Sequence, residues 1–295
     1  MSLRTVERVL VGEPTSDGGG VRLTRVLGPA HGLDPFLLLD EFDSSSADDY
    51  VAGFPAHPHR GFETVTYMLD GHMLHEDHLG NRGDLKPGGV QWMTAGRGII
   101  HSEMPQQRAG RMRGFQLWIN LPAAAKMQPA AYTDLEPGRI PTVELPGVRV
   151  RVVAGRFTAG LAATGAGAAE AAAPVAGPIA GGATEPMYLD VALEAGASLD
   201  LATPTGHTVL AYAFEGAPTV GGRSLAKGQL AILAAGEGVA IAGGAAPARV
   251  LVLGGRPLRE PVVHYGPFVM NTAAEIEQAL RDYRSGRLAE AQAPQ

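Results

Sequence analysis

The sequence predicts an all-β protein made of two tandem β-barrels and a short C-terminal α-helix. Its 295 residues include 40 glycines and 22 prolines, and its apolar runs are short, which is typical of brief strands joined by turns. A chain of this length exceeds the size at which one hydrophobic core usually keeps growing, so two domains are expected. A pattern of strands and glycines also recurs in the two halves, which indicates a duplicated unit.

Four short segments have the residue pattern of barrel strands. Residues 21–27 (VRLTRVL) alternate apolar and polar side chains, and residues 36–39 form a short apolar run. Residues 64–69 and 115–119 are rich in β-branched or aromatic side chains and are bounded by Gly, Asp or Pro. We expect all four to be strands.

The C-terminal helix has both a start signal and a periodic apolar face. Thr272 and Glu275 have the spacing of a capping box, in which each side chain bonds to the backbone of the other residue. Apolar side chains then recur at helical intervals from Ile276 to Tyr283, until a glycine ends the pattern. This pattern predicts an amphipathic helix.

Two pairs of segments carry the internal repeat. Residues 61–71 (GFETVTYMLDG) and 206–216 (GHTVLAYAFEG) share their terminal glycines and a tyrosine at an offset of 145. Residues 87–98 and 227–238 share three glycines and an alanine at an offset of 140. A strand, a glycine turn and a second strand that occur twice predict duplicated β-barrels.

The repeat divides the chain in sequence order. We expect the first barrel over residues 1–135, the second barrel with the helix over residues 136–288, and a disordered tail over residues 289–295. Residues 158–186 consist largely of alanine, glycine and proline and offer little to bury. They are expected to form an exposed connection.

The composition excludes several kinds of partner and site. The formal net charge is -6 and the basic residues are scattered, so direct binding of nucleic acid is not expected. The absence of cysteine excludes disulfides and thiolate metal sites. No run of 18 uncharged apolar residues occurs, and charges interrupt the apolar stretch near the N-terminus. We therefore expect a cytoplasmic protein that does not cross a membrane.

Six of the nine histidines fall between residues 57 and 101. His57 and His59 are two residues apart, which on a strand places both side chains on one face. His101 and Glu103 repeat this spacing, and Pro58 fixes the backbone within the first pair. The two pairs together predict one metal site with these three histidines and Glu103 as ligands. The alternative is a set of ordinary hydrogen-bonded histidines.

The ligand types restrict the metal. Three neutral imidazoles and one carboxylate suit a divalent first-row ion and leave two positions of an octahedron open. Open adjacent positions are what dioxygen chemistry on iron needs, because O2 and an activated substrate oxygen can then bind side by side. Iron(II) is therefore favoured, while manganese, nickel, copper and zinc stay open.

The second half lacks these residues at the matching positions. The two offsets give Ala202 and Pro204 for the first pair and Ile241 and Gly243 for the second pair. We therefore expect the metal chemistry to be confined to the first barrel.

Three further histidines and one acid are weaker candidates. His72, His75 and His78 are spaced by three, so a strand would place His75 opposite to the other two. We expect His72 and His78 to be solvated and treat His75 as a candidate for a pocket residue or a donor behind the ligands. Glu63 is ranked below Glu103, as a residue behind the ligands or at the core edge.

Three apolar residues are candidates for the walls of a substrate pocket. Phe54, Met93 and Trp118 suit a flat aromatic substrate, with core packing as the alternative for each. Glu103 is also the candidate base, because a carboxylate near a cation can accept a proton.

Two of the segments just described resemble the two cupin motifs as they occur in the pirin family. They are residues 57–71 (HPHRGFETVTYMLDG) and 84–105 (DLKPGGVQWMTAGRGIIHSEMP), and residues 114–129 and 259–288 continue the likeness. The resemblance implies two jelly-roll-like cupin barrels and a single metal, commonly iron, in the first of them. Its ligands match here at the two residue pairs already named.

The resemblance also implies two functions between which the sequence does not decide. One is a quercetinase-type dioxygenase, which opens a ring of a flavonol or a similar aromatic hydroxy compound with O2. The other is a non-enzymatic, iron-dependent redox-sensing regulator that binds a partner enzyme or transcription factor. Open coordination positions favour the enzyme, because a structural metal site does not need them.

Overall fold

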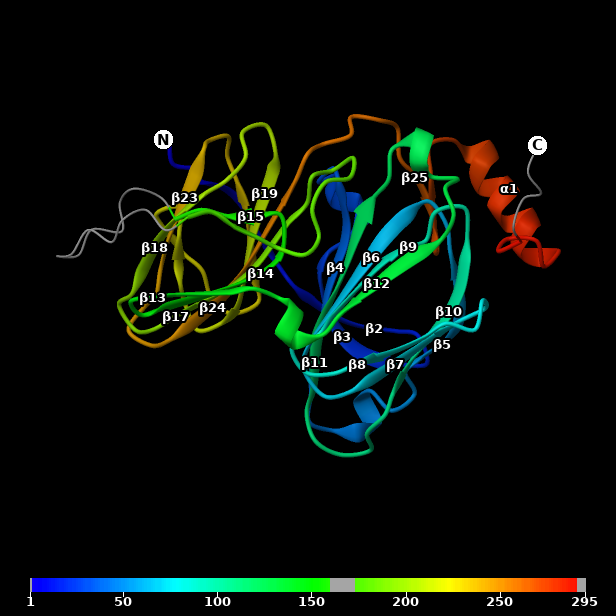
Figure 1. Ribbon diagram of the computed structural model, residues 1–295, viewed down its shortest axis with the longest axis horizontal. Helices are drawn as coiled ribbons and strands as arrows, with labels where there is room; N and C mark the ends of the chain where they lie inside the picture. The colour runs from blue at the N-terminus through cyan, green and yellow to red at the C-terminus, as the bar shows by residue number, and fades with distance from the viewer. Residues whose placement is uncertain (1, 160–172, 291–295) are drawn as a thin grey trace. The chain divides into compact units, whose positions relative to one another are not determined.

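The computed structural model describes residues 2–159 and 173–290 and is built almost entirely of antiparallel strands (Figure 1). The chain divides into two units. The first barrel comprises residues 13–137 and 258–290, and the described residues of the second barrel are 2–12, 138–159 and 173–257. The all-β prediction with two barrels is confirmed.

The first barrel contains a seven-stranded sheet of order β12-β9-β6-β11-β4-β3-β2 and a four-stranded sheet of order β5-β10-β7-β8. A hairpin of two strands and the single α-helix follow at its C-terminal end. The bounds are β2 Glu13–Asp17, β3 Val21–Leu27, β4 Phe36–Ser44, β5 Phe54–His59, β6 Phe62–Asp70, β7 Met73–Asp77, β8 Arg82–Leu85, β9 Val90–Thr94, β10 Ile99–Pro105, β11 Met112–Asn120, β12 Ala131–Leu135, β25 Val263–Tyr265, β26 Phe268–Met270 and α1 Ala273–Arg284.

The second barrel repeats this plan with sheets of order β1-β22-β19-β24-β17-β14-β13 and β18-β23-β20-β21. The bounds are β1 Val6–Val11, β13 Thr142–Leu145, β14 Val148–Ala154, β15 Arg156–Phe157, β16 Val175–Ala176, β17 Met187–Leu193, β18 Ser198–Ala202, β19 Thr208–Glu215, β20 Thr219–Val220, β21 Arg223–Ser224, β22 Gln229–Leu233, β23 Gly238–Ala242 and β24 Ala248–Gly255. Its interior is one continuous cluster of aliphatic side chains from both sheets.

The internal repeat is confirmed by strand register. In the first barrel Val65 on β6 pairs with Trp92 on β9. In the second barrel the corresponding pair is Leu210 on β19 and Ile232 on β22. These residues stand at the offsets of 145 and 140 read from the sequence, so the two hairpins are equivalent residue by residue.

The ends of the chain are grouped differently from the expected boundaries of 1–135 and 136–288. Strand β1 pairs with β22 at one edge of the second barrel, the place that β12 takes beside β9 in the first barrel. Residues 258–290 return to the first barrel, where Phe268 and Leu288 pack with Ile100 of β10. Non-local edge pairing decides this grouping, and a reading in chain order does not detect it.

The predicted helix is confirmed together with its cap. Thr272 accepts a hydrogen bond from the backbone N–H of Glu275 at 3.2 Å, and the Glu275 carboxylate accepts one from the backbone N–H of Thr272 at 2.8 Å. Arg60, which is almost fully buried, donates to the Asp282 carboxylate at 2.8 Å. The helix is therefore held to the strand end that carries His59.

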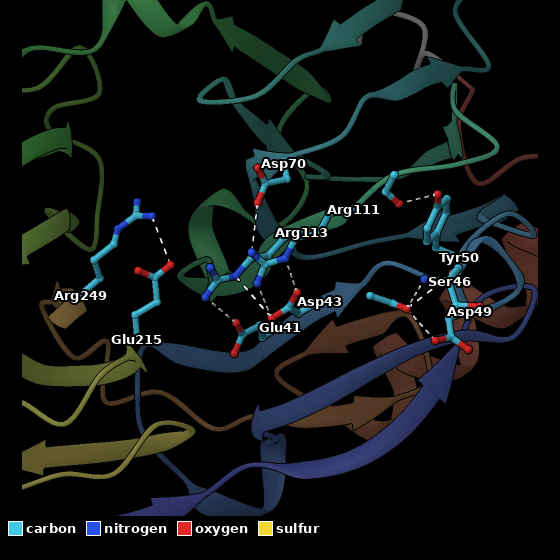
Figure 2. A network of polar contacts seen from close by, with 12 residues as sticks. Glu41, Asp43, Ser46, Asp49, Tyr50, Asp70, Arg111, Arg113, Glu215 and Arg249 are labelled. Atoms are coloured by element: carbon cyan, nitrogen blue, oxygen red, sulfur yellow. Dashed lines mark hydrogen bonds and ion pairs between the residues drawn. The ribbon is translucent and has the colours of Figure 1, made fainter. Parts of the chain in front are cut away.

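Charged pairs occupy the face of β4 and β11 that points away from the barrel interior (Figure 2). Arg111 donates two hydrogen bonds to Asp43 at 2.8 and 2.9 Å, and the buried Arg113 pairs with Glu41 at 3.4 Å. Asp43 and Glu41 alternate with Asp40 and Phe42, which face inward. One face of β4 thus carries the residues of these ion pairs, and the other face carries the residues that a ligand in the cavity can contact.

Two expectations concern segments that are described only in part. Within the expected connection of residues 158–186, Val175–Ala176 form β16 and pair with β15, while residues 160–172 lie outside the described residues. Most of the expected tail, residues 291–295, also lies outside them. Across the described part of the chain, no helix has the length and apolar character needed to span a membrane.

Candidate metal centre

Two paired strands bring three histidines together inside the first barrel. His101 on β10 lies directly opposite His57 on β5, and His59 follows on the same face of β5. His59 and His101 are 3% and 2% exposed, and His57 is half-buried. Within the described residues these three form a cluster whose ligand nitrogens all lie within 4.8 Å of one another.

The ring nitrogens of the first pair are arranged as ligands would be. His57 Nδ1 lies 2.8 Å from the carbonyl oxygen of Pro55, to which it can only donate, so the neutral ring keeps its lone pair on Nε2. That Nε2 lies 3.0 Å from Nε2 of His59. Two nitrogens bound at right angles to one ion at about 2.1 Å would lie about 3.0 Å apart. The distance fits a shared metal.

His101 supplies an unpartnered nitrogen to the same cluster. Its Nδ1 lies 3.3 Å from Nδ1 of His75, and its buried Nε2 has no hydrogen-bond partner in the described part of the chain. Burial lowers the pKa of His59 and His101 well below the ordinary value, and the neighbouring histidines add to the effect. Both rings are therefore neutral near pH 7, as metal ligands must be.

Glu103 lies in the cavity wall next to this cluster but outside the set of three. Glu103 lies two residues after His101 on the same face of β10, as expected, because β10 keeps its register against β7 through both residues. The register against β5 shifts between them, so that Glu103 lies opposite Phe54. Thr66 Oγ1 lies 3.0 Å from one carboxylate oxygen and 2.5 Å from Oε1 of Gln116, and its one hydroxyl proton can serve either acceptor. Gln116 Nε2 lies 3.4 Å from the other carboxylate oxygen. The carboxylate is 4% exposed and faces the same cavity as His57. The ligand role of all four residues stays a prediction.

The histidine cluster opens into a cavity of about 560 Å³ in the first barrel. Its walls are largely apolar and include Leu23, Leu38, Phe42, Phe54 and Trp118. A cavity of this size and character is typical of sites for small organic ligands.

Two glycine-containing turns line this cavity, and one of them belongs to the C-terminal hairpin of β25 and β26. Gly18, in the turn between β2 and β3, has φ +59, and a Cβ there would lie 2.5 Å from the Phe54 ring. The close approach of this turn to Phe54 therefore requires glycine. Gly266 and Pro267, between β25 and β26, also line the cavity. The segment that follows the second barrel in sequence thus completes the site in the first barrel.

The predicted wall residues divide into two groups. Phe54 and Trp118 line the cavity, and the Trp118 ring contacts the His59 ring edge-on at 5.2 Å between centroids. Met93 is fully buried in a cluster with Ala95 and Ile99 and does not contribute to the cavity lining. Met93 therefore packs in the core, which was the alternative to a role in the cavity wall.

The weaker candidates also separate clearly. His75 is 2% exposed and faces inward from β7 towards His101, whereas His72 bonds to Asp84 at the surface and His78 is exposed. Glu63 lies on the face of β6 opposite to Thr66 and accepts a hydrogen bond from Thr94 at 2.8 Å. It is therefore directed away from the cavity that Glu103 faces.

The second barrel has apolar residues at the positions that match the three histidines. Strand pairing identifies some of these positions differently from the sequence offsets. His101 corresponds to Ile241, which pairs with Leu199, and Leu201 takes the place of His59. The equivalents Ala202 and Pro204 inferred from the sequence were wrong. All three apolar residues belong to the core of the second barrel.

Comparison with known proteins agrees with this geometry. Residues 20–119 match the family model described as Pirin, and residues 188–289 match the Pirin C-terminal cupin domain. The chain belongs to the pirin family. Among curated pirin relatives, a Pseudomonas aeruginosa protein provisionally named a quercetin 2,3-dioxygenase is 56% identical over 97% of this chain and 98% of its own length. A pirin-like protein of Caulobacter vibrioides is 47% identical over 97% of this chain and its entire length.

A solved structure matches this pirin closely as well. The crystal structure of a quercetin 2,3-dioxygenase from Acinetobacter baumannii superposes with a TM-score of 0.82 at 33% identity, covering 98% of this chain and 99% of that one. The two-barrel cupin fold is therefore shared over the whole length.

Sequence reasoning missed the residues that hold Glu103. Thr66 and Gln116 lie on β6 and β11 of the opposite sheet and hydrogen-bond the carboxylate. The available signal was the presence of polar residues in two largely apolar strands, Thr64 and Thr66 in TVTYML and Gln116 in FQLWI. An inward polar residue in a barrel strand needs a partner and so marks a polar site.

Proposed function

We propose that this pirin is a metal-dependent dioxygenase that opens a ring of a flavonol or a similar aromatic hydroxy compound. Iron(II) would be held by His57, His59, His101 and Glu103. The observation that carries the proposal is the convergence of three imidazoles, two of which line an apolar cavity large enough for such a compound. The similarity to proteins named quercetin 2,3-dioxygenases supports the substrate class.

A divalent metal held at this site would supply a Lewis acid for the substrate oxygen and for O2. Three features of the protein prepare its side chains for that role. The bond from His57 Nδ1 to Pro55 leaves the Nε2 lone pair of that ring free, and His101 Nε2 has no hydrogen-bond partner among the described residues. Burial keeps the rings of His59 and His101 neutral. His59 and His101 therefore do not have to lose a proton before binding a metal near pH 7.

We assign the transfer of the substrate proton to Glu103. Its carboxylate faces the cavity beside the histidines, and one of its oxygens lies 3.0 Å from the Thr66 hydroxyl. Among the described residues the other oxygen has a longer contact, to Gln116 Nε2 at 3.4 Å, which leaves it available to accept the proton of a substrate hydroxyl. The apolar walls and the Trp118 ring hold a flat ring and exclude water from the reacting atoms.

Anaerobic mixing of iron-loaded protein with quercetin, followed by air, tests the proposal. A dioxygenase places both atoms of O2 in products of the substrate, so oxygen uptake should equal flavonol loss without an added reductant. A Glu103→Gln variant should bind quercetin but consume oxygen much more slowly, because the amide cannot take the proton. The absence of both oxygen uptake and ring-opened product would refute the proposal.

A further inference from the structure

A row of polar side chains crosses the seven-stranded sheet of the first barrel in register. Arg25 on β3 lies opposite Asp40 on β4. Asp40 in turn lies opposite Gln116 on β11, and Gln116 lies opposite Thr66 on β6. Directly opposed residues of antiparallel strands share one face of the sheet, and all four line the cavity. The cavity therefore has a polar stripe along one wall.

The two ends of this stripe have different partners. At the inner end, Thr66 and Gln116 contact the Glu103 carboxylate beside the histidine cluster. At the outer end, Arg25 makes a forked pair with Asp40, from Nε at 3.0 Å and from Nη2 at 2.8 Å. Neighbouring strands lie about 4.8 Å apart, so Asp40 and Arg25 lie about 5 and 10 Å beyond Gln116. A flat molecule of two or three rings spans that distance.

The outer end offers hydrogen-bond donors and acceptors together. Arg25 Nη2 also bonds to Asp17 at 3.2 Å, while Arg25 Nη1 has no hydrogen bond to the described residues. His264 lines the same region, and burial lowers its pKa, so its ring is neutral near pH 7. One guanidinium and two carboxylates leave a net charge of about -1 at this end. Such a site disfavours a carboxylate ligand but suits a hydroxyl, which can accept from Arg25 and donate to Asp40.

We propose that Arg25 and Asp40 recognise hydroxyl groups on the substrate ring that lies farthest from the histidine cluster. They thereby select neutral, polyhydroxylated aromatic compounds over aromatic carboxylates. This inference rests on the proposed function, because it takes the histidine cluster as the point at which the substrate is held. The forked pair to Asp40 sets the orientation of the guanidinium before the ligand arrives, which reduces the entropy lost on binding.

Calorimetric titration of the metal-loaded protein under nitrogen measures binding without turnover. The probes are quercetin, a flavonol without hydroxyls on its phenyl ring and a flavonol without hydroxyls on its benzo ring. Wild-type protein should bind quercetin about tenfold more tightly than at least one of these analogues, as expected for the loss of a hydrogen-bonded hydroxyl. Arg25→Met and Asp40→Asn should each reduce this preference to about threefold or less.

Arg22→Met is the matched control. Arg22 lies on the same strand, but its side chain is 77% exposed, pairs with Asp49 and does not line the cavity. This variant removes the same charge and should keep the wild-type preference. Thermal unfolding of each variant shows whether the barrel is intact, and Asp40→Asn retains a side-chain oxygen that can still accept from Arg25.

The outcomes separate this inference from the proposed function. Equal binding of all three flavonols by wild-type protein, with oxygen uptake still present, would overturn the inference alone. The same follows if the preference survives in both cavity variants or is lost equally in Arg22→Met. If no flavonol binds and none is oxidised, the proposed function fails and the inference fails with it.

Discussion

His75 allows the metal centre to be tested without altering any predicted ligand. It lies on β7 opposite Glu103, is 2% exposed, and its Nδ1 is 3.3 Å from Nδ1 of His101. Only one of these two nitrogens can carry the shared proton, so the contact decides which nitrogen of His101 keeps a free lone pair. With the proton on His101 Nδ1, the buried Nε2 of His101 is free for the metal.

The change His75→Phe keeps a ring of similar size and removes the acceptor. Partners of this kind typically contribute 10–100-fold to metal affinity, so the Kd should rise by about that factor, or about 1.4–2.7 kcal/mol. His75→Gln retains a side-chain amide that can accept the same proton and should recover part of the loss. The Kd is measured by competition with a chromophoric chelator, with iron(II) under nitrogen and with nickel(II) in air.

His72→Phe is the matched control, because His72 lies at the surface and its side chain bonds to Asp84 rather than to a residue of the histidine cluster. It should leave the Kd unchanged. An unchanged Kd in His75→Phe would refute the reasoning, since it would show that His101 does not depend on this contact. An equal rise in both variants would also refute it, because the effect would then not be specific to His75.

Three further predictions concern stability. Burial lowers the pKa of His101 well below its ordinary value, so below about pH 6.5 the unfolded chain binds protons that the folded apoprotein excludes. The free energy of unfolding of the apoprotein should therefore fall as pH decreases from 7 to 5, and it should fall less steeply in His101→Ile. Urea unfolding at each pH measures this, and an equal pH dependence in the variant and the wild type would contradict the reasoning. Burial lowers the pKa of Lys126 to about 8, yet its ammonium donates three hydrogen bonds of 2.7, 2.7 and 2.9 Å. Lys126→Met should therefore lower the free energy of unfolding by about 3 kcal/mol at pH 7. A loss below about 1 kcal/mol would show that desolvation of the charge cancels those bonds. Gly61 has φ +92, and a Cβ there would lie 2.0 Å from a backbone oxygen, whereas Gly20 has φ +108 and open space. Gly61→Ala should therefore destabilise the protein clearly more than Gly20→Ala in the same urea assay, and equal effects would contradict the overlap.

The features that the sequence predicted correctly depend on short-range patterns. The alternation in residues 21–27 gave β3 with its bounds, and the spacing of Thr272 and Glu275 gave the capped helix. The offset between the two repeats gave the register of β6 with β9 and of β19 with β22. Each of these is encoded within a few consecutive residues, where side-chain periodicity and capping chemistry act directly.

The features that the sequence did not predict depend on contacts between distant segments. Strand β1 joins the second barrel through pairing with β22, more than 200 residues later, and residues 258–290 return to the first barrel. Nothing local to β1 distinguishes one sheet edge from the other. The same limit applies to Arg25 and Asp40, whose place in the cavity depends on the pairing of β3 with β4.

The comparison of the two barrels shows how a local insertion changes the assignment of a site. Two residues separate β5 from β6, whereas five separate β18 from β19. The offset of 145 therefore holds after the turn but falls to 142 before it, so His57 corresponds to Leu199 rather than to Ala202.

The corrected alignment strengthens the contrast between the barrels. Leu199, Leu201 and Ile241 fill the core of the second barrel, so that barrel packs apolar side chains where the first holds neutral imidazoles. Buried imidazoles without full hydrogen bonding cost stability, and a bound metal would offset that cost in the first barrel only.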